Sequence, residues 1–481
     1  MQLSSRLGLA LTLGAAAIFA TVVSCGPNSG AGHGGSGGTG GGGNGGTGGA
    51  GASGGGSGGC VGLQCQQMQC PGGGTTSLTG KVFAPNGTLP LYNAIVYVPN
   101  STPAPFTDGV TCDRCNGSVS GDPVVITTTD ASGSFTLANV PVGNNIPLVI
   151  QLGKWRRQVV IPTVPSCVST PLDAGSTSLP KNKSEGDLPQ MAISTGSADP
   201  FECLLLKIGI DPAEITIPSG SGRVHFYLGD TKPGTKMTNA PKESDATNGL
   251  LISLQKMLAY DVIMLPCEGT NSYTTNNQAN ARSLLTQYLD AGGRLFSTHY
   301  SYQWLTYGSS PYNAISTDNN GMGWNVDQPM PCGQNSTCGY MGTLDTSFPK
   351  GQSFSMWLSN VTTPPVNGSF EITDPRNDLD ALNSATIAAQ RWMYHAGDNK
   401  VLHATFNTPL NPPPDDMGAP QYCGRVVFSD FHVSANEVTS TNGTFPGACK
   451  SGDLTTQEKA LAFMLFDLSS CVQSDQTNPI P

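Results

Sequence analysis

The sequence predicts a multidomain protein: a disordered Gly-rich linker, then a small all-β domain, then a larger α/β domain with a mostly parallel sheet. Short β-type runs between turn residues predict the first folded part, and alternating buried strands and amphipathic helices predict the second. Composition predicts the linker, because 20 of the 61 glycines lie between Gly30 and Gly59. Such a segment cannot bury a core, whereas the roughly 420 residues outside it and the leader suffice for two to three domains.

The first residues read as a targeting signal. Arg6 precedes an uncharged apolar run over 7–23, which is too short for a typical spanning helix and ends before Ser24 and Cys25. This segment resembles a bacterial lipoprotein signal. The resemblance implies a signal peptide at 1–24, lipidation of Cys25 and anchoring to membrane lipid in the cell envelope. Gly26, next to Cys25, implies the outer membrane. The alternative is an ordinary signal peptide with a chance cysteine.

A flexible tether is predicted over 25–59. No Asp, Glu, Lys or Arg occurs between Arg6 and Lys81, and a Gly-rich coil of this length spans about 30–35 Å. The whole chain has 23 Lys and Arg against 33 Asp and Glu, a net charge of −10. This balance offers no basic patch for phosphates, so no nucleic-acid partner is expected.

Cysteine usage indicates an oxidising compartment. Of 14 cysteines, thirteen remain besides Cys25, and six disulfides with one leftover thiol is the simplest count. We expect the Cys-rich entry segment 60–76 and the Cys112/Cys115 pair to staple the first domain, and Cys332 with Cys338 and Cys449 with Cys471 to form local clamps. The disulfide candidates are therefore Cys60, Cys65, Cys70, Cys112, Cys115, Cys332, Cys338, Cys449 and Cys471. A zinc site at Cys112/Cys115 is the alternative, but the spacing of the upstream cysteines is unusual for zinc, so no metal site and no cofactor are predicted.

The small domain is predicted over 77–165 as a β-sandwich. Runs such as 94–98, 124–126, 135–137, 148–150 and 159–161 alternate with turn residues. The stretches 80–82, 91–98, 129–137 and 140–143 resemble the carboxypeptidase regulatory-like domain, a transthyretin-like sandwich. That resemblance implies a spacer or binding module without peptidase activity.

The large domain is predicted over 199–472, after a linker at 166–198 and before a tail at 473–481. Strands are expected at 224–228, 262–265, 294–297, 401–406 and 425–429, and an insertion at about 307–399. Apolar positions at Ala281, Leu284, Leu285, Tyr288 and Leu289 indicate one face of a helix, and 455–468 predicts a buried closing helix. Strand–helix–strand units of this length favour a parallel sheet covered on both faces.

Three stretches of this domain, 260–265, 289–299 and 424–432, resemble the class I glutamine-amidotransferase-like superfamily, most nearly its trehalose-utilisation (ThuA-like) branch. The resemblance implies a flavodoxin-like fold. Active amidotransferases present a nucleophilic cysteine at the turn after the third strand, where this chain has Thr298, His299 and Tyr300. Glutaminase activity is therefore not expected.

Candidate site residues follow three predicted strands: Cys267 with Glu268, His299, and His432 with Glu437. In open α/β sheets ligands bind at the carboxyl ends of strands, so these groups are expected to converge. A thiol near two imidazoles is suited to nucleophilic or acid–base chemistry, with Cys267, His299, His432 and Glu437 as the catalytic candidates. The alternative is a disulfide at Cys267 and histidines that bond backbone carbonyls.

The favoured interpretation is a membrane-tethered binding or pseudo-enzymatic lipoprotein that recognises an envelope or extracellular ligand, such as a carbohydrate or peptide. One alternative is an exported hydrolase or isomerase acting on a carbohydrate or peptide, and another is a purely structural envelope protein. Aromatic side chains that offer stacking faces for sugar rings, or else belong to the core, are Trp304, Trp324, Trp357 and Trp392.

Overall fold

The computed structural model describes residues 59–115, 119–270, 278–306, 310–316, 324, 331–333, 336–383, 389–433, 435–440 and 442–478. Contacts divide the chain between Gly58 and Gly59, and everything from Gly59 onward forms one compact unit. The signal peptide 1–24, Cys25 and the tether up to residue 58 lie outside the described residues. Within the described part, no helix combines the length and apolarity needed to cross a bilayer.

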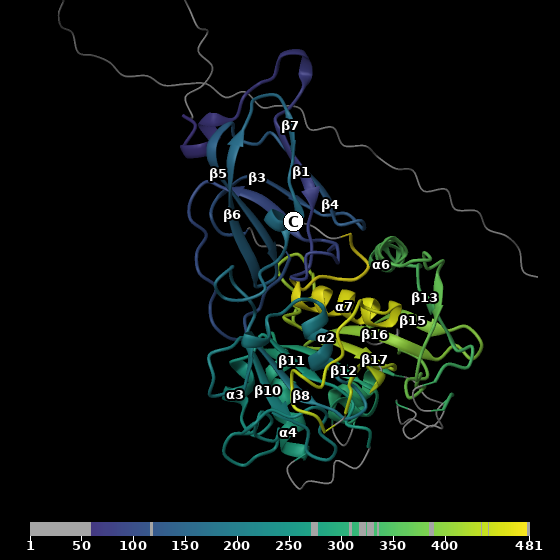
Figure 1. The fold of residues 1–481 in the computed structure, drawn as a ribbon. Helices are drawn as coiled ribbons and strands as arrows, with labels where there is room; N and C mark the ends of the chain where they lie inside the picture. The colour runs from purple at the N-terminus through teal and green to yellow at the C-terminus, as the bar shows by residue number, and fades with distance from the viewer. Residues whose placement is uncertain are drawn as a thin grey trace, which may run out of the picture. The chain divides into compact units, whose positions relative to one another are not determined.

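Two small sheets follow the entry segment (Figure 1). The first has the order β4 (Ser134–Ala138), β1 (Ser77–Lys81), β7 (Ser169–Pro171), and the second has the order β3 (Pro123–Thr128), β2 (Ile95–Pro99), β5 (Gly143–Leu152), β6 (Trp155–Val164). Alternate residues of both sheets, such as Leu78, Phe135, Val96 and Ile150, are buried in one core. The runs expected at 94–98, 124–126, 135–137, 148–150 and 159–161 are strands, as predicted.

The third sheet has ten strands and is mixed. Its order is β14 (Ser369–Glu371), β13 (Met341–Leu344), β15 (Ala389–His395), β16 (Val401–Thr408), β17 (Gly424–Ser429), β12 (Arg294–Thr298), β11 (Val262–Leu265), β8 (Met191–Thr195), β10 (Val224–Leu228), β9 (Ile215–Thr216). The strands from β17 to β9 are parallel, whereas β16, β15, β13 and β14 join in antiparallel pairs. The expectation of a mostly parallel sheet is therefore correct only for that half, because β16 runs antiparallel to β17 and the insertion 307–399 adds β15, β13 and β14 beyond it.

Helices cover both faces of the large sheet (Figure 1). On one side Met264, Phe296 and Val427 join the core of α2 (Phe201–Lys207), α6 (Pro349–Val361) and α7 (Thr456–Ser469). On the other side Ile263 and Leu295 pack in a second core with α3 (Leu254–Leu258), α4 (Gln278–Asp290) and α5 (Gln303–Thr306). Successive residues of a strand point to opposite faces, so strands buried on both sides read as continuous apolar runs.

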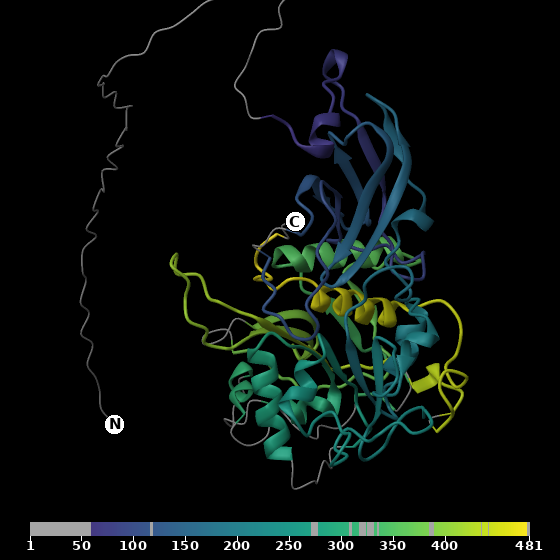
Figure 2. The ribbon, with the colours of Figure 1, turned by 90° about the vertical axis from the view of Figure 1, so that its left-hand side faces the viewer.

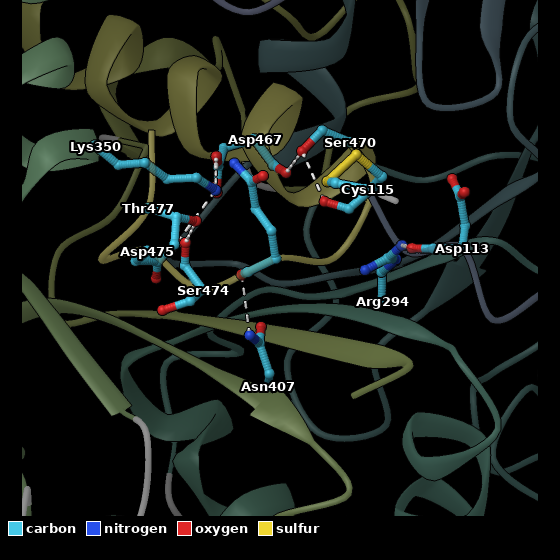
Figure 3. Close-up of a disulfide and its surroundings, with 12 residues drawn as sticks. Asp113, Cys115, Arg294, Lys350, Asn407, Asp467, Ser470, Ser474, Asp475 and Thr477 are labelled. Carbon is cyan, nitrogen blue, oxygen red and sulfur yellow. Dashed lines mark hydrogen bonds and ion pairs between the residues drawn. A yellow bond between two sulfur atoms is a disulfide. The ribbon is translucent and has the colours of Figure 1, made fainter. Parts of the chain in front are cut away.

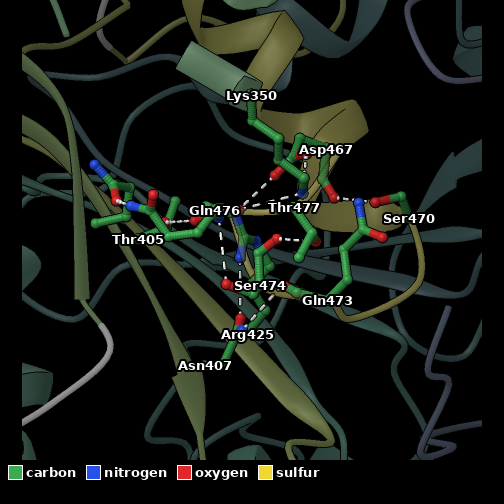
Figure 4. A network of polar contacts seen from close by, with 12 residues as sticks. Lys350, Thr405, Asn407, Arg425, Asp467, Ser470, Gln473, Ser474, Gln476 and Thr477 are labelled. Carbon is green, nitrogen blue, oxygen red and sulfur yellow. Dashed lines mark hydrogen bonds and ion pairs between the residues drawn. The ribbon is translucent and has the colours of Figure 1, made fainter. Parts of the chain in front are cut away.

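Two segments expected to lack regular structure are structured. The stretch 166–198, expected to be a linker, contains β7, α1 (Ala174–Thr177) and β8. In the expected tail, Asp475 is buried and bonds Arg425 Nη2 at 2.7 Å and Lys350 Nζ at 3.2 Å. Asp467 of α7 binds the same two cations, so the tail is held against the sheet by a buried network (Figure 4).

Six disulfides form among the described cysteines, and Cys267 is the free thiol, which confirms the predicted count and excludes a disulfide at Cys267. The pairs are Cys60–Cys65, Cys70–Cys167, Cys112–Cys423, Cys115–Cys471, Cys203–Cys449 and Cys332–Cys338.

The local clamp at Cys332–Cys338 is confirmed, but the predicted Cys449–Cys471 clamp is wrong. Cys112 and Cys115 do not staple the small sheets internally either. They bond cysteines after β16 and after α7, and Figure 3 shows the Cys115 bond beside Ser470. Both sulfurs are thus consumed in disulfides and are not available as zinc ligands.

The small sheets and the helices α6 and α7 share one core, which explains why the chain from Gly59 onward is a single unit. Trp357 Nε1 of α6 donates to the carbonyl of Pro90 at 2.8 Å, and Tyr92 stacks on Phe463 of α7. At Gly153 the backbones approach so closely that a Cβ would lie 1.7 Å from the carbonyl oxygen of Ser469. Figure 2 shows α7 running along the large sheet.

Candidate functional site

Four neighbouring parallel strands end at one edge of the large sheet and place polar side chains there. Asp199 follows β8, Cys267 follows β11, His299 follows β12 and His432 follows β17. Three of these were predicted from the order of strands in the sequence. The structure brings Cys267, His299 and His432 together.

The three side chains form a compact buried cluster. One ligand-type atom from each, the Cys267 sulfur and one ring nitrogen of His299 and of His432, lie within 4.8 Å of one another. Cys267 Sγ lies 3.1 Å from His299 Nδ1, and the two imidazole centroids are 5.0 Å apart. Cys267 and His432 are 0% exposed and His299 is 4% exposed.

The local backbone explains how the cluster fits together. His299 has φ +40°, a left-handed conformation that bends the chain sharply after β12 and that non-glycine residues rarely adopt. Cys267 N donates to Thr298 Oγ1 at 2.9 Å, which ties the ends of β11 and β12. Gly196 passes directly over Cys267, since a Cβ there would lie 2.1 Å from the Cys267 carbonyl oxygen.

Two carboxylates support the imidazoles from outside the cluster. Asp374 Oδ2 lies 3.0 Å from His432 Nδ1, and Asp378 Oδ2 lies 3.3 Å from His299 Nε2. Arg376, between them in sequence, donates to Asp374 Oδ1 at 2.7 Å. The alternative in which the histidines only bond backbone carbonyls is thus wrong: each ring pairs with a carboxylate.

The segment that carries these carboxylates is itself anchored. Gln457 of α7 accepts from Thr373 N at 2.9 Å and donates to the His432 carbonyl at 2.6 Å. Asp430 accepts from Leu379 N at 3.0 Å. One helix residue and one strand-end residue therefore hold the carboxylate segment and His432 in fixed register.

Burial determines the protonation of the cluster. It raises the pKa of the Cys267 thiol and lowers the pKa of His299 well below its usual value, so the ring is neutral. Burial also lowers the pKa of His432, against the opposing hydrogen bond to Asp374. Burial alone would raise the pKa of Asp374, but the His432 hydrogen bond and the Arg376 charge bring it to about 2.

These partners indicate which ring nitrogens carry the protons. A neutral imidazole has one donor and one acceptor nitrogen, and a carboxylate only accepts. His432 therefore donates from Nδ1 to Asp374 and His299 donates from Nε2 to Asp378. The acceptor nitrogens, His299 Nδ1 and His432 Nε2, remain for the interior of the cluster. His432 Nε2 is buried and has no hydrogen-bond partner.

Glu437 and Glu268 do not join the cluster. Glu437, in the turn Ala435–Glu437, pairs with Lys207 at 2.6 Å, and Lys207 also pairs with Glu458 of α7. Glu268 turns toward the loop after β10, where its carboxylate accepts from Thr231 N at 2.7 Å. The expectation that Glu437 converges with Cys267 and the two histidines is therefore wrong, because its carboxylate pairs with Lys207 instead.

Of the two interpretations of the tryptophans, stacking faces for sugars or core residues, the structure supports the second. Trp304, Trp324, Trp357 and Trp392 are all at most 5% exposed, so they belong to the core.

Sequence reasoning missed Asp374, Arg376 and Asp378. They lie within the expected insertion 307–399, where polar residues are frequent and no periodicity sets these three apart. The only local sign is Asp374 before Pro375, a turn-forming pair, and Asp374 indeed has φ +57°.

Two surface hollows lie away from the Cys267, His299 and His432 cluster. One of about 300 Å³ is lined by residues including Phe106, Arg114 and Lys154, beside the Cys115 disulfide. The other, of about 480 Å³, is lined by polar residues including Gln390, Arg391 and Gln476. None of Cys267, His299 and His432 lines either hollow, so the buried cluster is separate from both.

No family model matches the chain, and no curated protein matches it. Among solved structures, a type II cohesin–X-dockerin complex from Acetivibrio cellulolyticus with a mutated N-terminal interface is 14% identical, covering 31% of this chain and 95% of its own, with a TM-score of 0.16. A complex from the same organism with a mutated C-terminal interface is 17% identical, covering 25% and 76%, with a TM-score of 0.13. Such TM-scores support no conclusion about fold or function.

Proposed function

We propose that the chain is an exported lipoprotein, held on membrane lipid through Cys25, whose head binds a ligand of the cell envelope or its surroundings. The observation that carries the proposal is the pairing of the described cysteines, 60 to 471: six disulfides, with one buried thiol left over. Structural disulfides persist in oxidising compartments. The leader at 1–24 supplies the export signal, and the Gly-rich tether at 25–59 lets the folded head extend away from the lipid anchor.

We propose further that the small sheets are a carboxypeptidase regulatory-like spacer and that the parallel half of the large sheet is an amidotransferase-like, flavodoxin-like head. In support, the three stretches that carry the second resemblance contain β11, β12 and β17, which are adjacent in the sheet. The sharp turn after β12 is occupied by His299 instead of cysteine. A binding or pseudo-enzymatic head is consistent with that replacement.

Mass spectrometry of the mature protein, purified from membranes without thiol reductants, tests the anchor. We expect an N-terminal peptide that begins with acylated Cys25, and the six disulfides named above. The Cys25→Ser variant is expected to lose acylation and to leave the membrane fraction or remain unprocessed. An unmodified mature N-terminus that begins elsewhere would overturn the anchor.

A hydrolase remains a second candidate because of one specific observation. The Cys267 sulfur lies 3.1 Å from His299 Nδ1, and His299 Nε2 on the other side of the ring lies 3.3 Å from Asp378 Oδ2. A thiol, an imidazole and a carboxylate are thus in contact one after the other. This is the order of groups in thiol-dependent hydrolases. A nucleophile, however, must reach its substrate, and the Cys267 thiol is fully buried with a raised pKa.

Alkylation separates the two candidates. A binding head predicts that Cys267 resists iodoacetamide in the native protein and reacts only after unfolding, while a nucleophile predicts fast native alkylation. The location of the modified residue is read by peptide mass spectrometry. Rapid native labelling of Cys267 would favour the hydrolase, whose substrate would be a carbohydrate or a peptide.

A further inference from the structure

We propose that Cys267, His299 and His432 form a binding site for a divalent transition-metal ion, zinc being the ion that these ligands fit best. The inference goes beyond the lipid-anchored binding head and does not depend on acylation of Cys25. It was not apparent from the sequence, which predicted no metal site.

The donor set has the required chemistry. Zinc in proteins is bound by cysteine sulfur and histidine nitrogen, commonly with three protein ligands and one further position. Neutral imidazole nitrogens with lone pairs directed inward are the form that binds metal, and the carboxylates leave both histidines in that form. His299 offers Nδ1 and His432 offers Nε2.

The unpartnered His432 Nε2 is the strongest single indication. Buried polar groups are nearly always hydrogen-bonded, and an unpaired one is energetically unfavourable. This nitrogen is buried without a partner, although the opposite nitrogen of the same ring is well bonded to Asp374. A metal ion at the centre of the cluster would satisfy it.

The geometry needs little adjustment. Ligand atoms around tetrahedral zinc lie about 3.3–3.8 Å apart, given bonds of about 2.0–2.3 Å. Here the Cys267 sulfur and one ring nitrogen of each histidine lie within 4.8 Å of one another, and Cys267 Sγ lies 3.1 Å from His299 Nδ1. Small side-chain movements therefore suffice to place one ion among them.

The surroundings match those of metal sites. Asp374 and Asp378 fix the ring orientations as the outer carboxylates of histidine ligands commonly do. The amide of Gly269 donates to Cys267 Sγ at 3.2 Å, which stabilises charge on sulfur. Arg376 is the cation beside these carboxylates, so a divalent ion brings charge of the sign that favours a thiolate there.

Metal binding at this site needs no oxidant or reductant, because only a proton is released. The Cys267 S–H proton passes to solvent or buffer as the sulfur–metal bond forms, and the two neutral imidazoles keep their protons on the nitrogens that face the carboxylates. The bound thiolate would then be a ligand and not a nucleophile, which is consistent with its burial.

Cobalt titration of the full mature protein in detergent tests the site. The protein is first treated with a chelator, and thiol reductants are omitted so that the disulfides stay intact. We expect one cobalt ion per chain, with a thiolate-to-cobalt charge-transfer band in the near ultraviolet, and displacement by zinc. Cys267→Ser should abolish that band, and His432→Ala should weaken cobalt binding by at least about tenfold.

Two variants serve as controls. His403 is also buried, and neither of its ring nitrogens has a partner, but it lies outside the cluster. His395 pairs with Asp398 near the surface. His403→Gln and His395→Gln should keep both the band and the stoichiometry.

Zinc protection of the wild-type thiol keeps the test independent of variant folding. In partially denaturing conditions, zinc should slow alkylation of Cys267, whereas magnesium should not. Absence of cobalt binding, a charge-transfer band that survives in Cys267→Ser, or identical alkylation with and without zinc would each overturn the proposal.

Asp374 is a positioning residue in this account, and Asp374→Asn tests that role. The variant should bind cobalt about 10- to 100-fold more weakly, as is typical when the outer partner of a histidine ligand is lost. The charge-transfer band should persist at saturating cobalt, because the sulfur ligand is intact. Unchanged affinity would show that Asp374 does not orient the His432 ring.

Discussion

At the scale of single residues, burial without a partner cation sets the pKa of Glu202 at the start of α2. Its side chain is fully buried, Oε1 accepts from Thr235 N and Oγ1, and Oε2 has no partner. Burial raises the pKa of Glu202 from 4.5 to about 7. The folded protein therefore binds the Glu202 proton more tightly than the unfolded chain does.

This shift makes stability depend on pH in a defined direction. The contribution of protonated Glu202 is fully present below the unfolded pKa of 4.5 and is lost as the pH rises through about 7. Glu202→Gln cannot ionise. Its advantage in the free energy of unfolding over the wild type should therefore grow by about 3 kcal/mol between about pH 4 and pH 8.5.

Urea unfolding at both pH values, with disulfides intact, measures the difference. Glu371→Gln serves as the control, since it makes the same side-chain change at an exposed position. A gain at Glu202 that is equal at both pH values would contradict the assigned shift.

Residues at strand ends were predictable, whereas their partners were not. Cys267, His299 and His432 come just after predicted strands, and the parallel-sheet rule places such positions at one edge. Asp374 and Asp378 reach the same place from an irregular segment whose path is set by Asp430 and Gln457. Such long-range packing leaves no periodic trace in the sequence.

At the scale of elements, α7 combines an exposed N-cap residue with a buried body. Thr455 Oγ1 accepts from Glu458 N at 3.1 Å, and the Glu458 carboxylate accepts from Thr455 N at 2.8 Å. This reciprocal pair satisfies two amides that the helix itself leaves unbonded. Thr455 is exposed, so the cap can be removed without opening a cavity.

Thr455→Ala is expected to lower the free energy of unfolding by about 1 kcal/mol, the usual value of an N-terminal cap. Chemical denaturation monitored by tryptophan fluorescence gives the difference. Thr88 is exposed in a loop, and Thr88→Ala should change stability by less than half as much. Equal losses in the two variants would mean that the cap does not stabilise α7.

The bounds of inner strands were predicted from the sequence more accurately than those of strands near the sheet edge. The strands expected at 224–228 and 262–265 have those bounds as β10 and β11. All four residues of β11 are buried, and strands buried on both faces are marked by continuous apolar residues. β13 and β14 are four and three residues long and contain Gly342 and Glu371. Short strands of such composition are defined by their neighbours, so they were not predictable. The strand at 401–406 was predicted, but its antiparallel direction beside β17 leaves no mark in its composition.

At the scale of the whole molecule, disulfides connect parts of the chain that are far apart in sequence. Cys112–Cys423 and Cys115–Cys471 have separations of 311 and 356 residues. The number of bonds followed from the cysteine count and compartment, but the pairing depends on which segments the fold brings together. The sequence therefore favoured nearby partners, correctly for Cys332–Cys338 and wrongly for Cys449–Cys471.

Loop length predicts how much each bond stabilises the fold. A disulfide acts mainly by restricting the unfolded chain, more so for longer loops. With Cys112–Cys423 retained, the Cys115–Cys471 bond closes an additional loop of about 50 residues. Restricting a loop of that length in the unfolded chain stabilises the fold by about 4 kcal/mol. The short loop closed by Cys332–Cys338 corresponds to about 2 kcal/mol. Removing the first bond with paired Cys→Ser changes should thus lower the free energy of unfolding about twice as much as removing the second. Urea unfolding of both double variants under non-reducing conditions gives the comparison. Equal losses would show that native contacts around the bonds, and not the entropy of the unfolded chain, set their contribution.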